Sequence, residues 1–173
     1  MKKGIYTSGR ERFMKEDELI VSKTNLKGII TYANSVFCKI ADYTIDEVLN
    51  KPHNIVRHPM MPRAIFNLLW EKLSKEEEVF AYVLNCGKKG DHYWVFAHVT
   101  PSYTTDGVLQ GYHSNRRKPS NSALKVIQPL YQALFDEENK KATEHESTQA
   151  GHAFLELILK EKGVTYEEFV LSI

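Results

Sequence analysis

The 173-residue sequence has few of the features that mark several large protein classes. Its two cysteines, Cys38 and Cys86, lack the close spacing of zinc ligands, and isolated thiols are typical of a reducing compartment. No apolar run approaches the roughly eighteen residues of a transmembrane helix, and no apolar segment follows the first residues as in a secretory signal. We therefore expect a cytoplasmic protein without direct membrane insertion.

The sequence also lacks a charge excess and a catalytic motif. Lysine and arginine total 23 against 22 aspartates and glutamates, so the composition does not indicate a nucleic-acid partner. Asp91 and His92 have no nucleophile beside them, and residues 87–90 lack the length and the following helix of a phosphate-binding loop. We expect that the chain is not an enzyme.

Seven histidines are present, but they form no tight motif with carboxylates or cysteines, so no metal site is predicted. A single histidine is enough to bind haem iron. A haem-based gas sensor with His53 or His58 as the iron ligand is therefore an alternative to keep.

What the sequence does contain is enough apolar material for one domain with an appendage, at 42% hydrophobic and 11% aromatic residues. Turn residues and alternating patterns predict three regions: an N-terminal arm over 1–16, a core over 17–118 and a helical C-terminal extension over 119–173. The arm is polar and is expected to be exposed or to form a short helix. The strands of the core are expected over 18–24, 29–32, 79–85, 92–102 and 108–116, and its helices over 33–43, 44–49 and 63–73.

The C-terminal extension has helical periodicity in three pieces. Residues 124–134 form an amphipathic pattern in which Pro129 predicts a kink or an early break. Residues 136–152 are polar and resemble a linker, and two further helical pieces cover 154–162 and 166–171. Their apolar faces need a surface, which is the sheet, a second copy in a homodimer, or another protein.

The long strand over 92–102 has aromatic residues on both alternating faces. His92, Trp94 and Phe96 lie on one face, and Tyr93 lies on the other with small apolar residues. We therefore expect the sheet to be covered on both sides.

Three motifs in register resemble the PAS domain of Aer-type aerotaxis and energy-taxis receptors, and the resemblance covers about residues 17–135. The motifs are Gly28 to Asn34, the run Pro52-His53-Asn54 followed by Arg57-His58-Pro59 and Met61-Pro62, and Gly90 to Val95. The resemblance implies an α+β PAS fold, with a five-stranded antiparallel sheet and helices on one face. It also implies a non-covalently bound FAD and redox or energy sensing. Because the membrane anchor and methyl-accepting domain of the larger receptors are missing here, it implies a stand-alone form that signals to a separate membrane-bound chemotaxis transducer.

The same resemblance suggests how a flavin would be held. Phe66, Trp70 and Trp94 would wall a slot for the ring, and Asn34 and Asn85 would offer amides to its polar edge. Arg57 and His58 would pair with the phosphates or the ring carbonyls. Each residue also has an ordinary structural interpretation: Asn34 is a good helix N-cap, the aromatic residues are good core residues, and Arg57 and His58 could satisfy backbone carbonyls.

The sequence departs from the family pattern at three places. Met60 stands where the family has an aspartate, Val79 where it has a tryptophan, and Cys86-Gly87 follows Asn85 where an arginine is usual. A cofactor-free PAS interaction or relay module is therefore a second hypothesis. A thiol that adds to the flavin is not expected, since Cys86 falls where a strand meets a turn.

Overall fold

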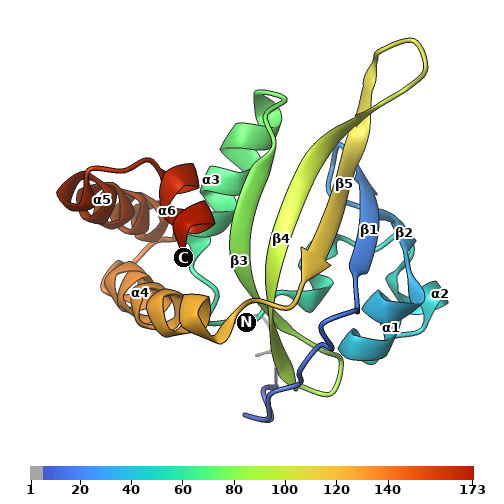
Figure 1. Ribbon diagram of the computed structural model, residues 1–173, viewed down its shortest axis with the longest axis horizontal. Helices are drawn as coiled ribbons and strands as arrows, with labels where there is room; N and C mark the ends of the chain where they lie inside the picture. Colours follow the sequence, from blue (N-terminus) through green and yellow to red (C-terminus); the bar gives the residue numbers. More distant parts are fainter. Residues whose placement is uncertain (1–5) are drawn as a thin grey trace.

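A computed structural model of the chain describes residues 6–173 and contains one five-stranded antiparallel sheet (Figure 1). The strands are β1 (Ile20–Asn25), β2 (Ile30–Ala33), β3 (Val79–Cys86), β4 (His92–Tyr103) and β5 (Leu109–Arg117). Their order is β2-β1-β5-β4-β3, so the two N-terminal strands join the edge of the three-stranded meander through β5. All five predicted strands are confirmed.

Three short helices, a 3-10 turn among them, and one longer helix connect β2 to β3. They are α1 (Ser35–Ala41), α2 (Ile45–Val48), the 3-10 turn η1 (His53–Val56) and α3 (Arg63–Ser74). The capping box that Thr44 and Glu47 predict is present at α2. Helix α1 is shorter than the predicted 33–43, because Asn34 caps its start and Asp42 has a left-handed backbone at its end.

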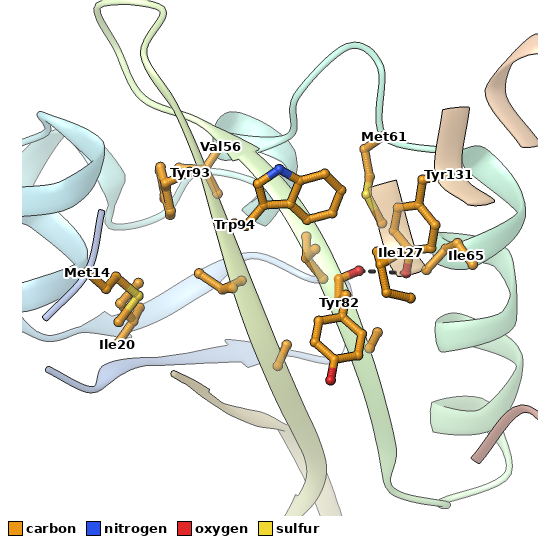
Figure 2. Close-up of a cluster of buried hydrophobic side chains, with 14 of the residues drawn as sticks. Met14, Ile20, Val56, Met61, Ile65, Tyr82, Tyr93, Trp94, Ile127 and Tyr131 are labelled. Carbon is orange, nitrogen blue, oxygen red and sulfur yellow. Dashed lines mark hydrogen bonds between the residues drawn. The ribbon is translucent and has the colours of Figure 1, made fainter. Parts of the chain in front are cut away.

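The two faces of the sheet have different partners. Along β4, Tyr93, Val95 and Ala97 point toward the face on which α3 and η1 lie, whereas Trp94 points to the opposite face. On that opposite face the Trp94 ring lies 5.8 Å from the ring of Tyr131, whose hydroxyl donates a 2.7 Å hydrogen bond to the Tyr82 carbonyl (Figure 2). Both faces are thus covered near β3, as the aromatic alternation predicts.

The C-terminal extension forms three helices: α4 (Asn121–Asn139), α5 (Glu144–Lys162) and α6 (Tyr166–Ser172). They pack against the chain's own α3 and β3 (Figure 1). Helix α4 continues past Pro129, so the early break is not present.

The prediction of a linker over 136–152 is wrong, because only residues 140–143 separate α4 from α5. The buried residues of this region are Glu138, Ser147 and Gly151, which are polar or small. Because polar and small residues make this helix contact, the segment lacks the apolar residues at helical spacing by which a packed helix is predicted.

The described part of the N-terminal arm, residues 6–16, is largely extended and contains no helix. Ser8, Arg10 and Arg12 all bind the buried Asp91 carboxylate, at 2.7, 2.7 and 2.9 Å. Hydrogen bonds from Arg10, Ser8 and Arg12 hold the pKa of Asp91 well below its usual range. The arm is therefore fastened beside the start of β4, and Met14 is buried in the core. Residues 1–5 of the predicted arm lie outside the described residues.

Over residues 6–173, none of the helices combines the length and the apolar character needed to cross a bilayer.

Candidate ligand-binding pocket

A cavity of about 380 Å³ lies between the sheet and helix α3. The size falls in the range of small-molecule and cofactor sites. Its walls come from four strands, the β1–β2 turn, η1 with the segment after it, α3 and the start of α5. The lining residues are Ser22, Thr24, Lys27, Gly28, Pro52, His53, Asn54, Arg57, Arg63, Phe66, Asn67, Leu69, Trp70, Leu73, Val83, Asn85, Ala97, Val99, Tyr112, Ser114, Arg116, Glu144 and Thr148.

Cations dominate the charged residues of this lining. Lys27, Arg57, Arg63 and Arg116 contribute four positive charges, and Glu144 contributes the single carboxylate. That carboxylate is already paired, since Glu144 lies 3.2 Å from the Arg63 guanidinium. The pocket therefore favours a ligand with negative or electron-rich groups.

Arg116 is the most deeply placed of these cations, at 5% exposure. Its Nη2 donates to Ser22 Oγ at 2.8 Å and to His53 Nε2 at 2.7 Å. Burial lowers the pKa of Arg116 to about 10, and burial together with the Arg116 charge lowers the pKa of His53 to about 3. His53 is therefore neutral and acts as an acceptor, and it leaves the positive charge of Arg116 uncompensated.

Ser114 lies on the same face of β5 as Arg116, two residues away. Its buried hydroxyl has no hydrogen-bond partner among residues 6–173. A buried polar group without a partner is costly, so Ser114 and Arg116 together form a site on the cavity wall that a polar ligand would satisfy.

Arg57 and Asn85 lie together at another part of the wall, where their backbones form an isolated bridge. The Arg57 guanidinium covers the Phe66 ring at 4.2 Å and donates to the Met61 carbonyl at 3.3 Å. Asn85 is 3% exposed, and within the described chain its amide forms no side-chain hydrogen bond. This part of the wall therefore offers both a cation and an uncommitted amide to a ligand.

The rim of the pocket has an aromatic corner. The Trp70 ring lies 5.7 Å from the Tyr112 ring in an edge-on arrangement. Gly28 has a positive φ of 73°, and a Cβ there would lie 3.1 Å from the Trp70 ring. The left-handed backbone favours glycine at this position, and a Cβ would also force the Trp70 ring to shift by a few tenths of an ångström.

Four of the seven predicted ligand residues line this pocket: Arg57, Phe66, Trp70 and Asn85. The structure places the other three elsewhere. Asn34 is committed to the backbone: its Oδ1 accepts from Val21 and Phe37, and its Nδ2 donates to Leu19. We therefore assign Asn34 a structural role in capping α1 and fastening β1.

His58 and Trp94 are the other two residues outside the pocket. The His58 Nδ1 accepts from the Met60 amide at 3.1 Å, its ring lies 5.9 Å from the His92 ring, and burial lowers its pKa to about 4. Trp94 lies on the opposite face of the sheet, against Tyr131. Neither side chain reaches the cavity in this fold.

The three departures from the family pattern also lie outside the lining. Met60 is 42% exposed, Val79 at the start of β3 is buried in a cluster with Leu73 and Val99, and Cys86 is buried at the end of β3. The three residues themselves therefore contribute nothing to the cavity wall.

Haem ligation receives little support from the geometry. Arg116 and Ser22 both contact the Nε2 of His53, and His58 does not line the cavity. Within residues 6–173 no group of three or more histidine, cysteine or acidic side chains could hold a metal ion.

Comparison with known proteins agrees with this fold. The family described as PAS fold matches residues 30–116. The aerotaxis receptor of Escherichia coli (strain K12) is 38% identical over 129 residues, which is 75% of this chain and 25% of the receptor. The nitrogen fixation regulatory protein of Klebsiella pneumoniae is 27% identical over 109 residues, which is 63% of this chain and 22% of that protein. The chain thus spans about a quarter of the length of these curated relatives.

Solved structures show the same architecture. A light-oxygen-voltage domain studied with a flavin analogue superposes with a TM-score of 0.56 at 21% identity, over 71% of this chain and 87% of that one. The light-state structure of the Aureochrome1 light-oxygen-voltage domain has a TM-score of 0.57 at 16% identity, over 66% and 90%. With this fold, and with the sequence match to the aerotaxis receptor, the chain belongs to the PAS family and its PAS domain is of the aerotaxis-receptor type.

Proposed function

We propose that this chain is a sensor, not an enzyme, whose PAS pocket binds a flavin, with FAD as the expected form. The observation that carries the proposal is the uncompensated Arg116 on the wall of a cationic cavity, with the unpartnered Ser114 hydroxyl beside it and the Asn85 amide at another part of the same wall. A flavin has a planar apolar ring, a polar pyrimidine edge and, in FAD, a pyrophosphate. The lining supplies a counterpart for each of these parts.

The apolar part of the lining suits a planar ring. Val83, Ala97 and Val99 give the sheet side a surface of small branched or short side chains, and Phe66 faces them from α3. Arg57 fixes the Phe66 ring by stacking on it. These residues would exclude water from the ring and hold its plane in one orientation.

The polar part of the lining suits the ring edge and the phosphates. Asn85 offers a donor and an acceptor in one group, and Arg116 and Ser114 offer donors. Lys27 and Arg63 are further cations of the same cavity, and with Arg57 they suit phosphate oxygens. A bound flavin would supply reversible electron transfer, and the protein would sense its charge through Arg116.

The signalling role rests on the relatives. The aerotaxis receptor is named for its response, and this chain is 38% identical to part of it. A cytoplasmic redox or energy sensor that passes its signal to a membrane-bound chemotaxis transducer fits that similarity. The C-terminal helices of this chain are the surface through which we expect the transducer, or a second copy in a homodimer, to be reached.

The test is the absorption spectrum of the freshly purified, untagged chain, followed by heat release and chromatographic identification of any chromophore. We expect the two flavin bands, and release of FAD. Arg57→Ala should reduce the bound fraction, whereas Arg117→Ala, which changes an exposed arginine next to Arg116, should not. A folded protein that takes up no flavin would refute the proposal and favour the relay module, and a Soret band would favour the haem sensor.

A further inference from the structure

The residue at the N-cap position of α3 does not cap the helix. Pro62 occupies the N-cap position and makes no side-chain hydrogen bond there. The first backbone N–H groups of a helix have no partner within the helix and need one from elsewhere. In this fold the partner comes from α4: the Glu138 carboxylate accepts from the N–H of Arg63 and from that of Ala64, each at 2.9 Å.

This contact is buried and tightly packed. Glu138 is 3% exposed, and its carboxylate at the positive end of the α3 dipole is favourably placed. Gly151 of α5 closes the third side, because a Cβ there would lie 2.5 Å from Glu138 Oε1 and 3.0 Å from Ala64 Cβ. Helices α3, α4 and α5 therefore meet at one point, on the side of the molecule where the C-terminal helices gather (Figure 1).

The helix held in this way is also a wall of the pocket. Arg63, Phe66 and Trp70 all lie on α3 and line the cavity. Helix α5 adds Glu144 and Thr148 to the same lining, and Glu144 pairs with Arg63 at 3.2 Å. A movement of α3 relative to a ligand in the cavity therefore requires α4 and α5 either to move with it or to resist it.

We propose that Glu138 is a positioning residue for the pocket, and that through it ligand binding and the docking of α5 are coupled. The inference rests on the proposed flavin site, and it adds that the C-terminal helices set the affinity of that site. Coupling of this kind is reciprocal. If docking of α5 raises the affinity of the pocket for its ligand by some factor, ligand binding must favour the docking of α5 by the same factor.

The test titrates the full-length, flavin-free chain with FAD and follows amide hydrogen exchange over residues 144–151. The variants are Glu138→Gln, which removes the charge and keeps the shape, and Gly151→Ala, which pushes α5 away from Glu138. The matched control is Glu137→Gln, since Glu137 binds only Lys140 in the described chain. Circular dichroism establishes whether each variant is folded. If Gly151→Ala does not fold, the result for Glu138→Gln alone decides the test.

We expect the two variants to raise the Kd for FAD at least fivefold and the control to leave it within twofold. FAD should slow exchange over 144–151 in the wild type, and less so in Glu138→Gln. The inference is overturned if Glu138→Gln binds FAD as the wild type does and FAD leaves exchange in α5 unchanged. A wild-type chain that binds no FAD overturns the flavin site itself, a result that is seen before any variant is made.

Discussion

Replacing Arg116 by methionine should stabilise the ligand-free protein and weaken ligand binding. The guanidinium is buried without an acidic partner among residues 6–173, and burial has lowered its pKa to about 10. Removing a buried, uncompensated charge in favour of an apolar side chain of similar length should raise the free energy of unfolding by about 1–3 kcal/mol. The two groups left behind can satisfy each other, because Ser22 Oγ lies 3.1 Å from His53 Nε2.

The same substitution should weaken the binding of FAD. A hydrogen bond to a charged group is worth about 1.5–3 kcal/mol, which corresponds to a rise of roughly 10- to 150-fold in the Kd for FAD. The assays are urea unfolding of the ligand-free chain and a fluorescence titration with FAD, with Arg117→Met as the exposed control. The reasoning is refuted if Arg116→Met lowers stability while FAD binds as tightly as before, because Arg116 would then be a structural residue and not a ligand anchor.

Three further predictions concern polar side chains that are not themselves proposed ligand contacts. His53 has a pKa of about 3 in the folded chain against an ordinary 6.5, so as the pH falls the unfolded chain binds the proton first and the free energy of unfolding decreases below pH 6.5. This loss of stability should reach ~2 kcal/mol at pH 5. In urea unfolding, His53→Gln should abolish the loss, whereas His145→Gln, which changes an exposed histidine, should not. Asp91→Asn should release the arm, so trypsin should cut after Arg10 several-fold faster than in wild type; an unchanged rate would mean that the arm is held by other contacts. Tyr131→Phe removes the donor to the Tyr82 carbonyl and should cost about 1–3 kcal/mol, and a loss below 0.5 kcal/mol by the same unfolding assay, roughly the smallest expected for a hydrogen bond, would show that this bond contributes little.

The parts of the fold that sequence predicts best are those fixed by local signals. The strands have a period of two, and the capping box at Thr44 and Glu47 requires only residues three apart. Helix α3 was expected from its apolar stripe, but its cap was not, because Glu138 is 74 positions away from Ala64. Long-range polar contacts of this kind carry no local pattern.

The pocket was predictable in part for a similar reason. Alternation along β4 separates Trp94 from Tyr93 without saying which face forms the cavity, and Trp94 lies on the face that α4 covers. Asn34 matches the family motif, but it stands directly before α1, and its side-chain oxygen accepts the Phe37 N–H as a helix N-cap. Arg116 was missed, although its alternation with Ser114 and Tyr112 on the inner face of β5 is the signal that could have revealed it.

A crystal structure of the chain grown with FAD is the most direct test of the central claim, that the cationic cavity is a flavin site. We predict flavin density between Phe66 and the inner face of β4, with the Asn85 amide and the Arg116 guanidinium within hydrogen-bond distance of it. The account would be contradicted by FAD bound elsewhere on the protein, or by a cavity that shows no flavin density.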